Sequence, residues 1–289
     1  MNISELTKVY ISERDNTENY NKQLEFCIQH LINFVGRDIS PAALDYQMIN
    51  RWITNLLEKQ DLSPSSVTRY RRAVLTIWKF AADLDLCGYP IVRRIKRVKL
   101  VHKPPQAFTI DQVASLIQAA KEERGVYGAG IRRALFWASI IGTAYDTGLR
   151  RGDILALPFD VSDGKPFQIV ENKTGRVQLR QISPQVCEWI QISGERELAF
   201  PWTLGIREFP DHFNRIRNRA KIKHGHFKWL RRTNGSLLGT LGHSSPHVFE
   251  TFYNDKTLNN TVKLPPAIPC QEPSTTATQS KRLKKSDGT

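Results

Sequence analysis

Four basic side chains, a histidine and a tyrosine follow one another through the second half of the chain: Arg150, Lys173, Lys228, Arg231, His243 and Tyr253. Guanidinium and ammonium groups hold phosphate oxygens and neutralise the charge that develops when phosphorus is attacked. A phenolic hydroxyl is able to make that attack and to form a covalent intermediate. These residue types are therefore the parts needed to bind a phosphodiester and to break it.

The spacing around the two arginines indicates how these side chains would be held. Asp153 follows Arg150 by three residues, one helical turn, so we expect its carboxylate to hold the Arg150 guanidinium. Lys228 and Arg231 are also three residues apart, so on a helix they share a face and can both address one phosphate. An arginine fixed by a carboxylate is suited to act as a phosphate clamp.

Each of these residues also has a simpler explanation when it is taken alone. Lys173 begins a turn-like Lys-Thr-Gly segment, where a lysine is usually only solvated. His243 follows a glycine and would most often be structural, and Tyr253 lies in an aromatic stripe that usually belongs to a core. Only the ordered combination favours a shared chemical role.

Length and charge narrow the class of protein. The 289 residues exceed what one ordinary hydrophobic core serves, so we expect two domains. The formal net charge of +14 favours a polyanionic partner, because each phosphate contact by lysine or arginine releases counterions.

The remaining composition argues for a protein of a reducing compartment. The cysteines lie far apart with no CxxC pair, which argues against a zinc ribbon and against a disulfide framework: Cys27, Cys87, Cys187 and Cys270. The first residues lack the sections of a signal peptide, and no run of about 18 apolar residues could span a bilayer. We expect a soluble, cytoplasmic protein without a membrane partner, associated with the nucleoid if it is bacterial or phage-borne.

The first part of the chain predicts a small all-helical domain over residues 1–92. Apolar residues recur at helical spacing from Tyr20 to Val35. Ser40-Pro41 and Ser63-Pro64 each offer an N-cap followed by proline at the first helical position, and an apolar helical stripe follows each of them. Residues 93–107 then predict a basic interdomain linker, whose run of basic residues ends at Pro104-Pro105.

Basic residues gather on the third predicted helix and in the linker. A solvated surface and a charged connection would account for them, and for the helix residues alone that interpretation is favoured. The position of the run between two domains favours a clamp that meets a DNA backbone. The candidate DNA-binding residues are Arg69, Arg71, Arg72, Arg93, Arg94, Lys96 and Arg97.

The second domain is predicted over residues 108–258. Thr109 and Gln112 have capping-box spacing, and a longer helix follows over about 131–145. The pattern then changes to two short strands joined by a turn, at 167–170 and 177–180, before helices resume at about 184–192, 208–220 and 226–238. We expect a mostly α protein with a small β-sheet, and a disordered tail over 259–289 that is rich in proline, serine and threonine.

Over about residues 20–258 the ordered combination resembles the tyrosine recombinases, also called phage integrases. That resemblance implies a helical core-binding domain and a mixed α+β catalytic domain that together clamp DNA. By motif, Arg150 matches the first catalytic arginine and Asp153 its acidic supporter. Lys173 matches the hairpin lysine, which is expected to protonate the 5′ oxygen of the leaving group.

The later motifs carry over in the same way. Lys228 occupies the first position of the His-x-x-Arg motif, where lysine is a known variation, and Arg231 matches the second catalytic arginine. His243 matches the histidine of Leu-Gly-His, and Tyr253 matches the nucleophile. The resemblance implies a 3′-phosphotyrosyl intermediate, no metal or nucleotide cofactor, double-stranded DNA as partner, and a homotetramer on paired sites.

One departure from the family pattern keeps two alternatives open. Arg231 and His243 are only twelve residues apart, which is shorter than in most family members. The chain could therefore be a catalytically impaired relative that still binds DNA. A type IB topoisomerase-like enzyme that relaxes DNA as a monomer is the other alternative, and it differs because it needs no paired specific sites.

Overall fold

The computed structural model describes residues 1–58, 60–100, 104–127, 130–173 and 175–238. The predictions for His243, Tyr253 and the tail over 259–289 lie outside these described residues. The chain divides into two compact units, Met1–His102 and Lys103–Thr289.

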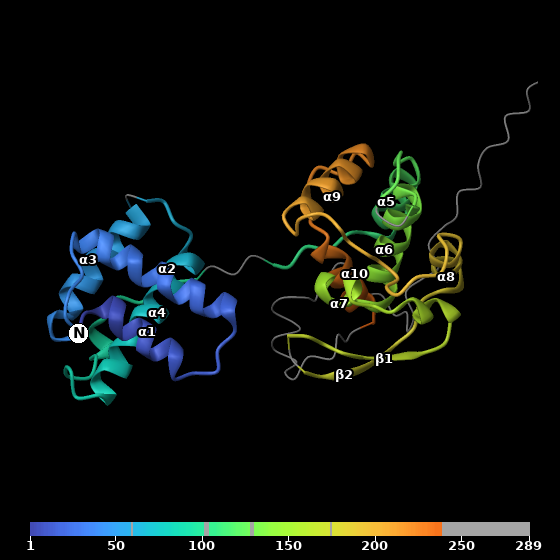
Figure 1. Ribbon diagram of the computed structural model, residues 1–289. Helices are drawn as coiled ribbons and strands as arrows, with labels where there is room; N and C mark the ends of the chain where they lie inside the picture. The colour runs from blue at the N-terminus through green and yellow to red at the C-terminus, as the bar shows by residue number, and fades with distance from the viewer. Residues whose placement is uncertain (59, 101–103, 128–129, 174, 239–289) are drawn as a thin grey trace, which may run out of the picture. The chain divides into compact units, whose positions relative to one another are not determined.

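The first unit is a helical bundle whose last long helix lies against the others (Figure 1). Its helices are α1 (Ile3–Ser12), α2 (Glu18–Val35), α3 (Tyr46–Glu58) and α4 (Pro64–Asp83), with short 3-10 helices at Pro41–Ala43 and Val92–Arg94. Helix α4 contacts α1, α2 and α3, and Trp52 of α3 is fully buried among them. Burial of these apolar stripes holds the bundle together.

The helix predicted over Tyr20 to Val35 and the helix start predicted at Ser63-Pro64 are confirmed. The Thr17 hydroxyl accepts a hydrogen bond from the Tyr20 amide and caps α2, which ends at Gly36 with a left-handed φ of 83°. The Ser63 hydroxyl accepts from the Ser66 amide and caps α4.

The predicted helix start at Ser40-Pro41 is wrong. These residues open only the 3-10 turn, and α3 begins further on, where one carboxylate oxygen of Asp45 accepts from the amides of Gln47 and Met48 at 2.6 and 3.2 Å. Helix α1 is an addition that the periodicity did not indicate, although Asn2 and Glu5 form a capping box at its start.

The first residues of the predicted linker belong to the first unit. Ile95 is only 2% exposed and packs in that unit's core. The Asn50 amide group donates to the Arg94 carbonyl and accepts from the Lys96 amide, at 2.9 and 2.7 Å. The chain is therefore fastened to α3 and α4 through residue 96 instead of leaving the domain at residue 93.

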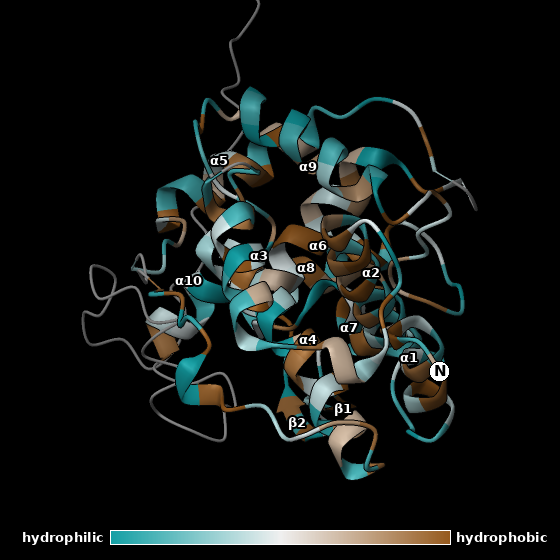
Figure 2. Cartoon of the chain, turned by 90° about the vertical axis from the view of Figure 1, so that its left-hand side faces the viewer, coloured by the Kyte–Doolittle hydropathy of each residue, from teal (hydrophilic) through white to brown (hydrophobic). Residues whose placement is uncertain are grey.

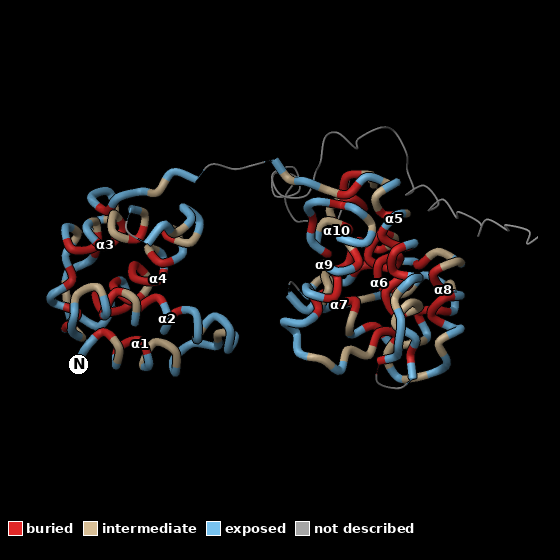
Figure 3. The backbone as a smooth tube through the Cα atoms, turned by 90° about the horizontal axis from the view of Figure 1, so that it is seen from above, coloured by how far each residue is buried: buried red, intermediate tan, exposed pale blue. Residues whose placement is uncertain are grey.

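The second unit surrounds one buried helix with shorter elements. These are α5 (Ile110–Lys121), α6 (Arg133–Thr147), α7 (Arg151–Leu155), the 3-10 helix η4 (Phe159–Asp163), β1 (Phe167–Val170), β2 (Val177–Arg180), α8 (Pro184–Gln191), α9 (Glu208–Arg219) and α10 (Lys228–Leu238). Helix α6 contacts α5, α7, α8 and α10. It is apolar and buried almost all round, brown in Figure 2 and red in Figure 3, as expected for a helix at the centre of a unit.

The strands coincide with the two predicted ones and form an antiparallel hairpin in which Val170 pairs with Val177. The described residues are thus mostly helical with one small two-stranded sheet, which confirms the predicted fold class. The capping box of Thr109 and Gln112 is also present, at the start of α5. None of the described helices combines the length and apolar character that crossing a bilayer requires.

Candidate active site

A cavity of about 470 Å³ in the second unit brings together side chains from distant parts of the sequence. Its walls come from the start of α7, the β1–β2 turn, α9 and the start of α10. Four of the residues selected from the sequence line it: Arg150, Lys173, Lys228 and Arg231. The other two, His243 and Tyr253, lie outside the described residues.

The junction between α6 and α7 sets the position of the first arginine. Gly148 ends α6 with a left-handed φ of 63°, which glycine adopts without strain, and Leu149 is buried. Arg150 is the extended residue that precedes α7. The Arg150 side chain therefore projects from the junction between two helices, where the backbone conformation is fixed.

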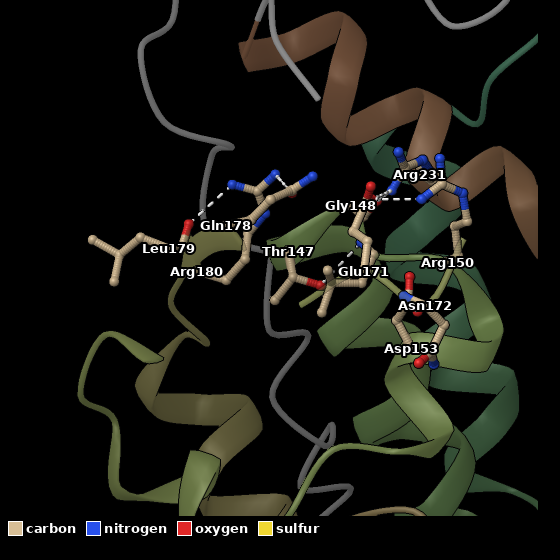
Figure 4. A network of polar contacts seen from close by, with 11 residues as sticks. Thr147, Gly148, Arg150, Asp153, Glu171, Asn172, Gln178, Leu179, Arg180 and Arg231 are labelled. Atoms are coloured by element: carbon tan, nitrogen blue, oxygen red, sulfur yellow. Dashed lines mark hydrogen bonds and ion pairs between the residues drawn. The ribbon is translucent and has the colours of Figure 1, made fainter. Parts of the chain in front are cut away.

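One buried carboxylate joins the two arginines (Figure 4). An oxygen of Glu171 lies 2.7 Å from the Arg150 guanidinium, in an ion pair, and 3.4 Å from the Arg231 guanidinium. The same Arg231 nitrogen donates to the Gly148 carbonyl at 2.6 Å. Glu171 is 1% exposed and Arg231 is 2% exposed, so both charges are withdrawn from water and depend on their partners.

Asp153 is the partner that the sequence predicts for the Arg150 guanidinium. Its buried carboxylate accepts from the backbone amide of Asn172 at 3.1 Å, and the ion pair of Arg150 is made with Glu171. Asp153 lies in the first turn of α7, and its carboxylate faces Asn172, just after the end of β1. Asp153 thus fixes the residue that follows Glu171.

The two lysines differ from the arginines in their surroundings. Lys173 lies in the turn between β1 and β2, two residues after Glu171. Lys228 is the first residue of α10 and is exposed, whereas Arg231 on the same helix is buried. The cavity therefore combines two fixed guanidinium groups with two ammonium groups on its accessible side.

A third arginine adds to the positive charge beside Glu171. Burial lowers the pKa of Arg180, and the nearby charge of Arg231 lowers it further, while the Glu171 carboxylate acts in the opposite direction. Arg180 contacts the side chain of Gln178 on the inner face of the hairpin (Figure 4). The carboxylate thus offsets a crowding of cations that would otherwise oppose folding.

Aromatic rings form the apolar wall of the cavity. Phe227 packs edge-on against Phe209 and Phe213, with ring centroids 5.0 and 5.5 Å apart. The Arg151 guanidinium lies 5.3 Å from the centre of the Phe209 ring. This wall gives the cavity a fixed shape on the side of α9.

Sequence reasoning missed three residues of the site: Glu171, Arg151 and His226. A signal for Glu171 exists, because strand alternation puts it on the same side as Phe167 and Ile169, and a charge on a core-facing side needs a partner. His226 lines the cavity just before α10. No comparable pattern marks it in the sequence.

The predicted DNA-binding residues lie on the first unit, and nearly all are exposed. Arg71 is half-buried and donates to the Lys96 carbonyl at 3.0 Å; burial lowers its pKa, followed by the charges of Arg97 and Arg72. Arg94 lies over the Tyr46 ring, and the Lys96 ammonium donates to the Thr54 hydroxyl. The remaining members of the set, including Arg69 and Arg93, are exposed.

No group of three or more histidine, cysteine, aspartate or glutamate side chains within the described ranges is arranged to hold a metal ion.

Comparison with known proteins gives matches among solved structures. No family model matches the sequence, and no curated protein matches it. A lambda integrase dimer bound to a COC′ core site matches with a TM-score of 0.68 at 17% identity, over 86% of this chain and 97% of that one. A lambda integrase tetramer bound to a Holliday junction matches with a TM-score of 0.66 at 15% identity, over 88% and 76%.

A transposon integrase also matches, with a lower TM-score. The Tn1549 integrase in complex with circular intermediate DNA matches with a TM-score of 0.59 at 13% identity, over 90% of this chain and 94% of that one. These neighbours are tyrosine recombinases. The chain has their fold, which confirms the expected resemblance at that level.

Proposed function

We propose that this chain, which has the fold of the tyrosine recombinases, cleaves and rejoins double-stranded DNA at specific sites through a 3′-phosphotyrosyl link to Tyr253. The observation that carries the proposal is the cavity lined by Arg150, Lys173, Lys228 and Arg231. Residues chosen from sequence order alone meet there, although they come from three separate segments.

Each side chain has a role in the proposed reaction. The Tyr253 hydroxyl loses its proton to water and its oxygen forms a bond to phosphorus as the bond to the 5′ oxygen breaks; the 5′ oxygen takes a proton from Lys173. Arg150 and Arg231 hold the non-bridging oxygens, with Lys228 and His243 adding positive charge. The phosphotyrosyl link retains the bond energy, so a 5′ hydroxyl of a partner strand can reverse the step.

The first unit is proposed to grip the DNA backbone through the exposed basic residues of α4 and of residues 93–97. The lambda integrase structures are a dimer and a tetramer bound to DNA. By analogy we propose that this chain also assembles as a homotetramer on paired sites.

A covalent trapping assay tests the proposal. Nicked duplexes prepared from the DNA that flanks the gene for this chain are incubated with the protein, which is then denatured. We expect a protein–DNA adduct in the wild type and none in Tyr253→Phe. An adduct that persists in Tyr253→Phe would overturn the assignment of the nucleophile.

The short spacing between Arg231 and His243 favours a second candidate, a relative that binds DNA without cleaving it. Binding of the same duplexes without any adduct would support that candidate. A supercoiled plasmid without those sites tests the topoisomerase alternative, because relaxation by a monomer needs no specific site.

A further inference from the structure

We propose that Glu171 is a positioning residue that ties the turn carrying Lys173 to the pair of arginines. The inference rests on the proposed function, because it assigns to Lys173 the proton for the leaving oxygen. It concerns a residue with no place in the motifs of the chain.

The side chain of Glu171 fixes one end of this connection. Its carboxylate lies 2.7 Å from the Arg150 guanidinium and 3.4 Å from that of Arg231, and the residue is 1% exposed. Both distances are within ion-pairing range, so the buried carboxylate restrains both guanidinium groups. The end of β1 is thereby held against the α6–α7 junction and α10.

The backbone of Glu171 fixes the other end. Its amide donates to the Arg176 carbonyl at 2.9 Å, and its carbonyl accepts from the Gly175 amide at 2.8 Å. Both bonds close the turn that contains Lys173. The next amide, of Asn172, donates to Asp153 of α7 at 3.1 Å. One residue thus closes the lysine turn with its backbone and reaches both arginines with its side chain.

A simpler explanation is that Glu171 only balances charge among the cations Arg150, Arg180 and Arg231. The two explanations predict opposite changes in phosphate binding when the carboxylate is removed. If the carboxylate only balanced charge, its removal would strengthen the attraction of the cavity for a phosphate anion. If it positions the cations, its removal weakens phosphate binding in spite of the more positive charge.

Two variants separate length from charge. Glu171→Gln keeps the length of the side chain and loses its charge, whereas Glu171→Asp keeps the charge and shortens the reach. Positioning predicts slower adduct formation in both, by up to roughly a hundredfold, since a misplacement of about 1 Å can cost about that much in rate. Glu188→Gln, an exposed carboxylate on α8, is the matched control and keeps the wild-type rate.

A sulfur substitution in the DNA tests whether the Glu171 variants form the adduct slowly because Lys173 is misplaced. A nicked duplex with sulfur in place of the bridging 5′ oxygen releases a thiolate, which needs no proton. We expect this duplex to restore most of the rate in Lys173→Ala and part of it in both Glu171 variants, where the arginines are displaced as well, but not in Arg231→Ala. An equal loss on the oxygen and sulfur duplexes overturns the connection to Lys173.

Inorganic phosphate gives a readout that does not depend on cleavage. We expect phosphate to raise the unfolding temperature of the wild type and to raise it less in both Glu171 variants. A larger shift in Glu171→Gln overturns positioning in favour of charge balance. If the wild type shows the phosphate shift but gives no adduct, the proposed function fails while this test of Glu171 still stands. If the wild type shows no adduct and no phosphate shift, both the proposed function and the role of Glu171 are overturned.

Discussion

The arginines of the site are held by groups that a phosphate would not displace. The Glu171 carboxylate forms ion pairs with Arg150 and Arg231, and the Gly148 carbonyl accepts a hydrogen bond from Arg231 at 2.6 Å. Two guanidinium groups oriented before the substrate arrives need no rearrangement in the transition state. The same burial makes each charged group costly to remove.

At the residue scale, Arg231→Ala is expected to cost both stability and activity. It leaves the buried Glu171 with fewer partners, and breaking a buried ion pair destabilises by about 3 kcal/mol. Urea unfolding measures that loss, and the trapping assay should give no detectable adduct. Arg232→Ala is the control, since Arg232 donates to the Gln106 carbonyl away from the cavity; an equal loss of adduct there would contradict the account.

Several helices and the hairpin could be predicted because their signals are local. The alternation at 167–170 and 177–180, the capping box at Thr109 and the Ser63-Pro64 start all act within a few residues. Ser40-Pro41 carries a similar start signal, but Asp45 caps the helix instead.

The contacts within the site were less predictable because they are long-range. The order of the motifs selected four cavity residues, but it could not indicate that Glu171 is the partner of Arg150. That pairing depends on how the end of β1 lies against the α6–α7 junction and α10, and a local sequence pattern does not indicate such a long-range contact.

At the element scale, two residues could have capped α3, and the structure shows that Asp45 does so and Ser40 does not. Asp45→Ala removes the acceptor of two amides and is expected to lower the free energy of unfolding by about 1 kcal/mol. Ser40→Ala, at the start that the sequence favoured, should change it much less. Urea titrations of both variants measure the difference; a larger loss in Ser40→Ala would contradict the observed start of α3.

A buried histidine makes the packing of α9 sensitive to pH. The Nδ1 atom of His212 accepts from Arg215 at 2.7 Å and contacts the Tyr127 hydroxyl at 3.1 Å. Burial lowers the pKa of His212 below its ordinary value of 6.5, followed by the charges of Arg215 and Arg133, with Glu123 and Glu208 acting in the opposite direction.

The unfolded chain therefore binds a proton at His212 more readily than the folded one. The contribution of His212 to stability is complete above about pH 6.5 and is lost as the pH falls towards the lowered pKa. Urea midpoints from pH 8 to pH 5 should decline more steeply in the wild type than in His212→Asn. Parallel curves would show that His212 does not titrate in this way.

At the scale of the whole molecule, we propose that the first unit binds the DNA backbone and that the second unit carries out the reaction. The first unit carries exposed cations that suit the DNA backbone, and the second carries the cavity for chemistry. Backbone contacts position a protein without reading sequence, so their loss should weaken binding evenly across DNA sites.

The salt dependence of DNA binding tests this division. Arg93→Ala and Arg97→Ala are each expected to reduce the slope of log affinity against log salt by about one. Adduct formation at saturating protein should stay unchanged. Lys8→Ala, an exposed lysine on α1 outside the proposed surface, serves as the control; an equal change of slope there would point to a general charge effect.

The central claim is that the cavity serves a phosphotyrosyl reaction, and the covalent link itself tests it most directly. The adduct from the trapping assay is digested with nuclease and protease, and the peptide that keeps a nucleotide is sequenced by mass spectrometry. The account predicts that this nucleotide is attached to Tyr253 through its 3′ phosphate. A nucleotide on another residue, or the absence of any adduct on DNA that the protein binds, would contradict it.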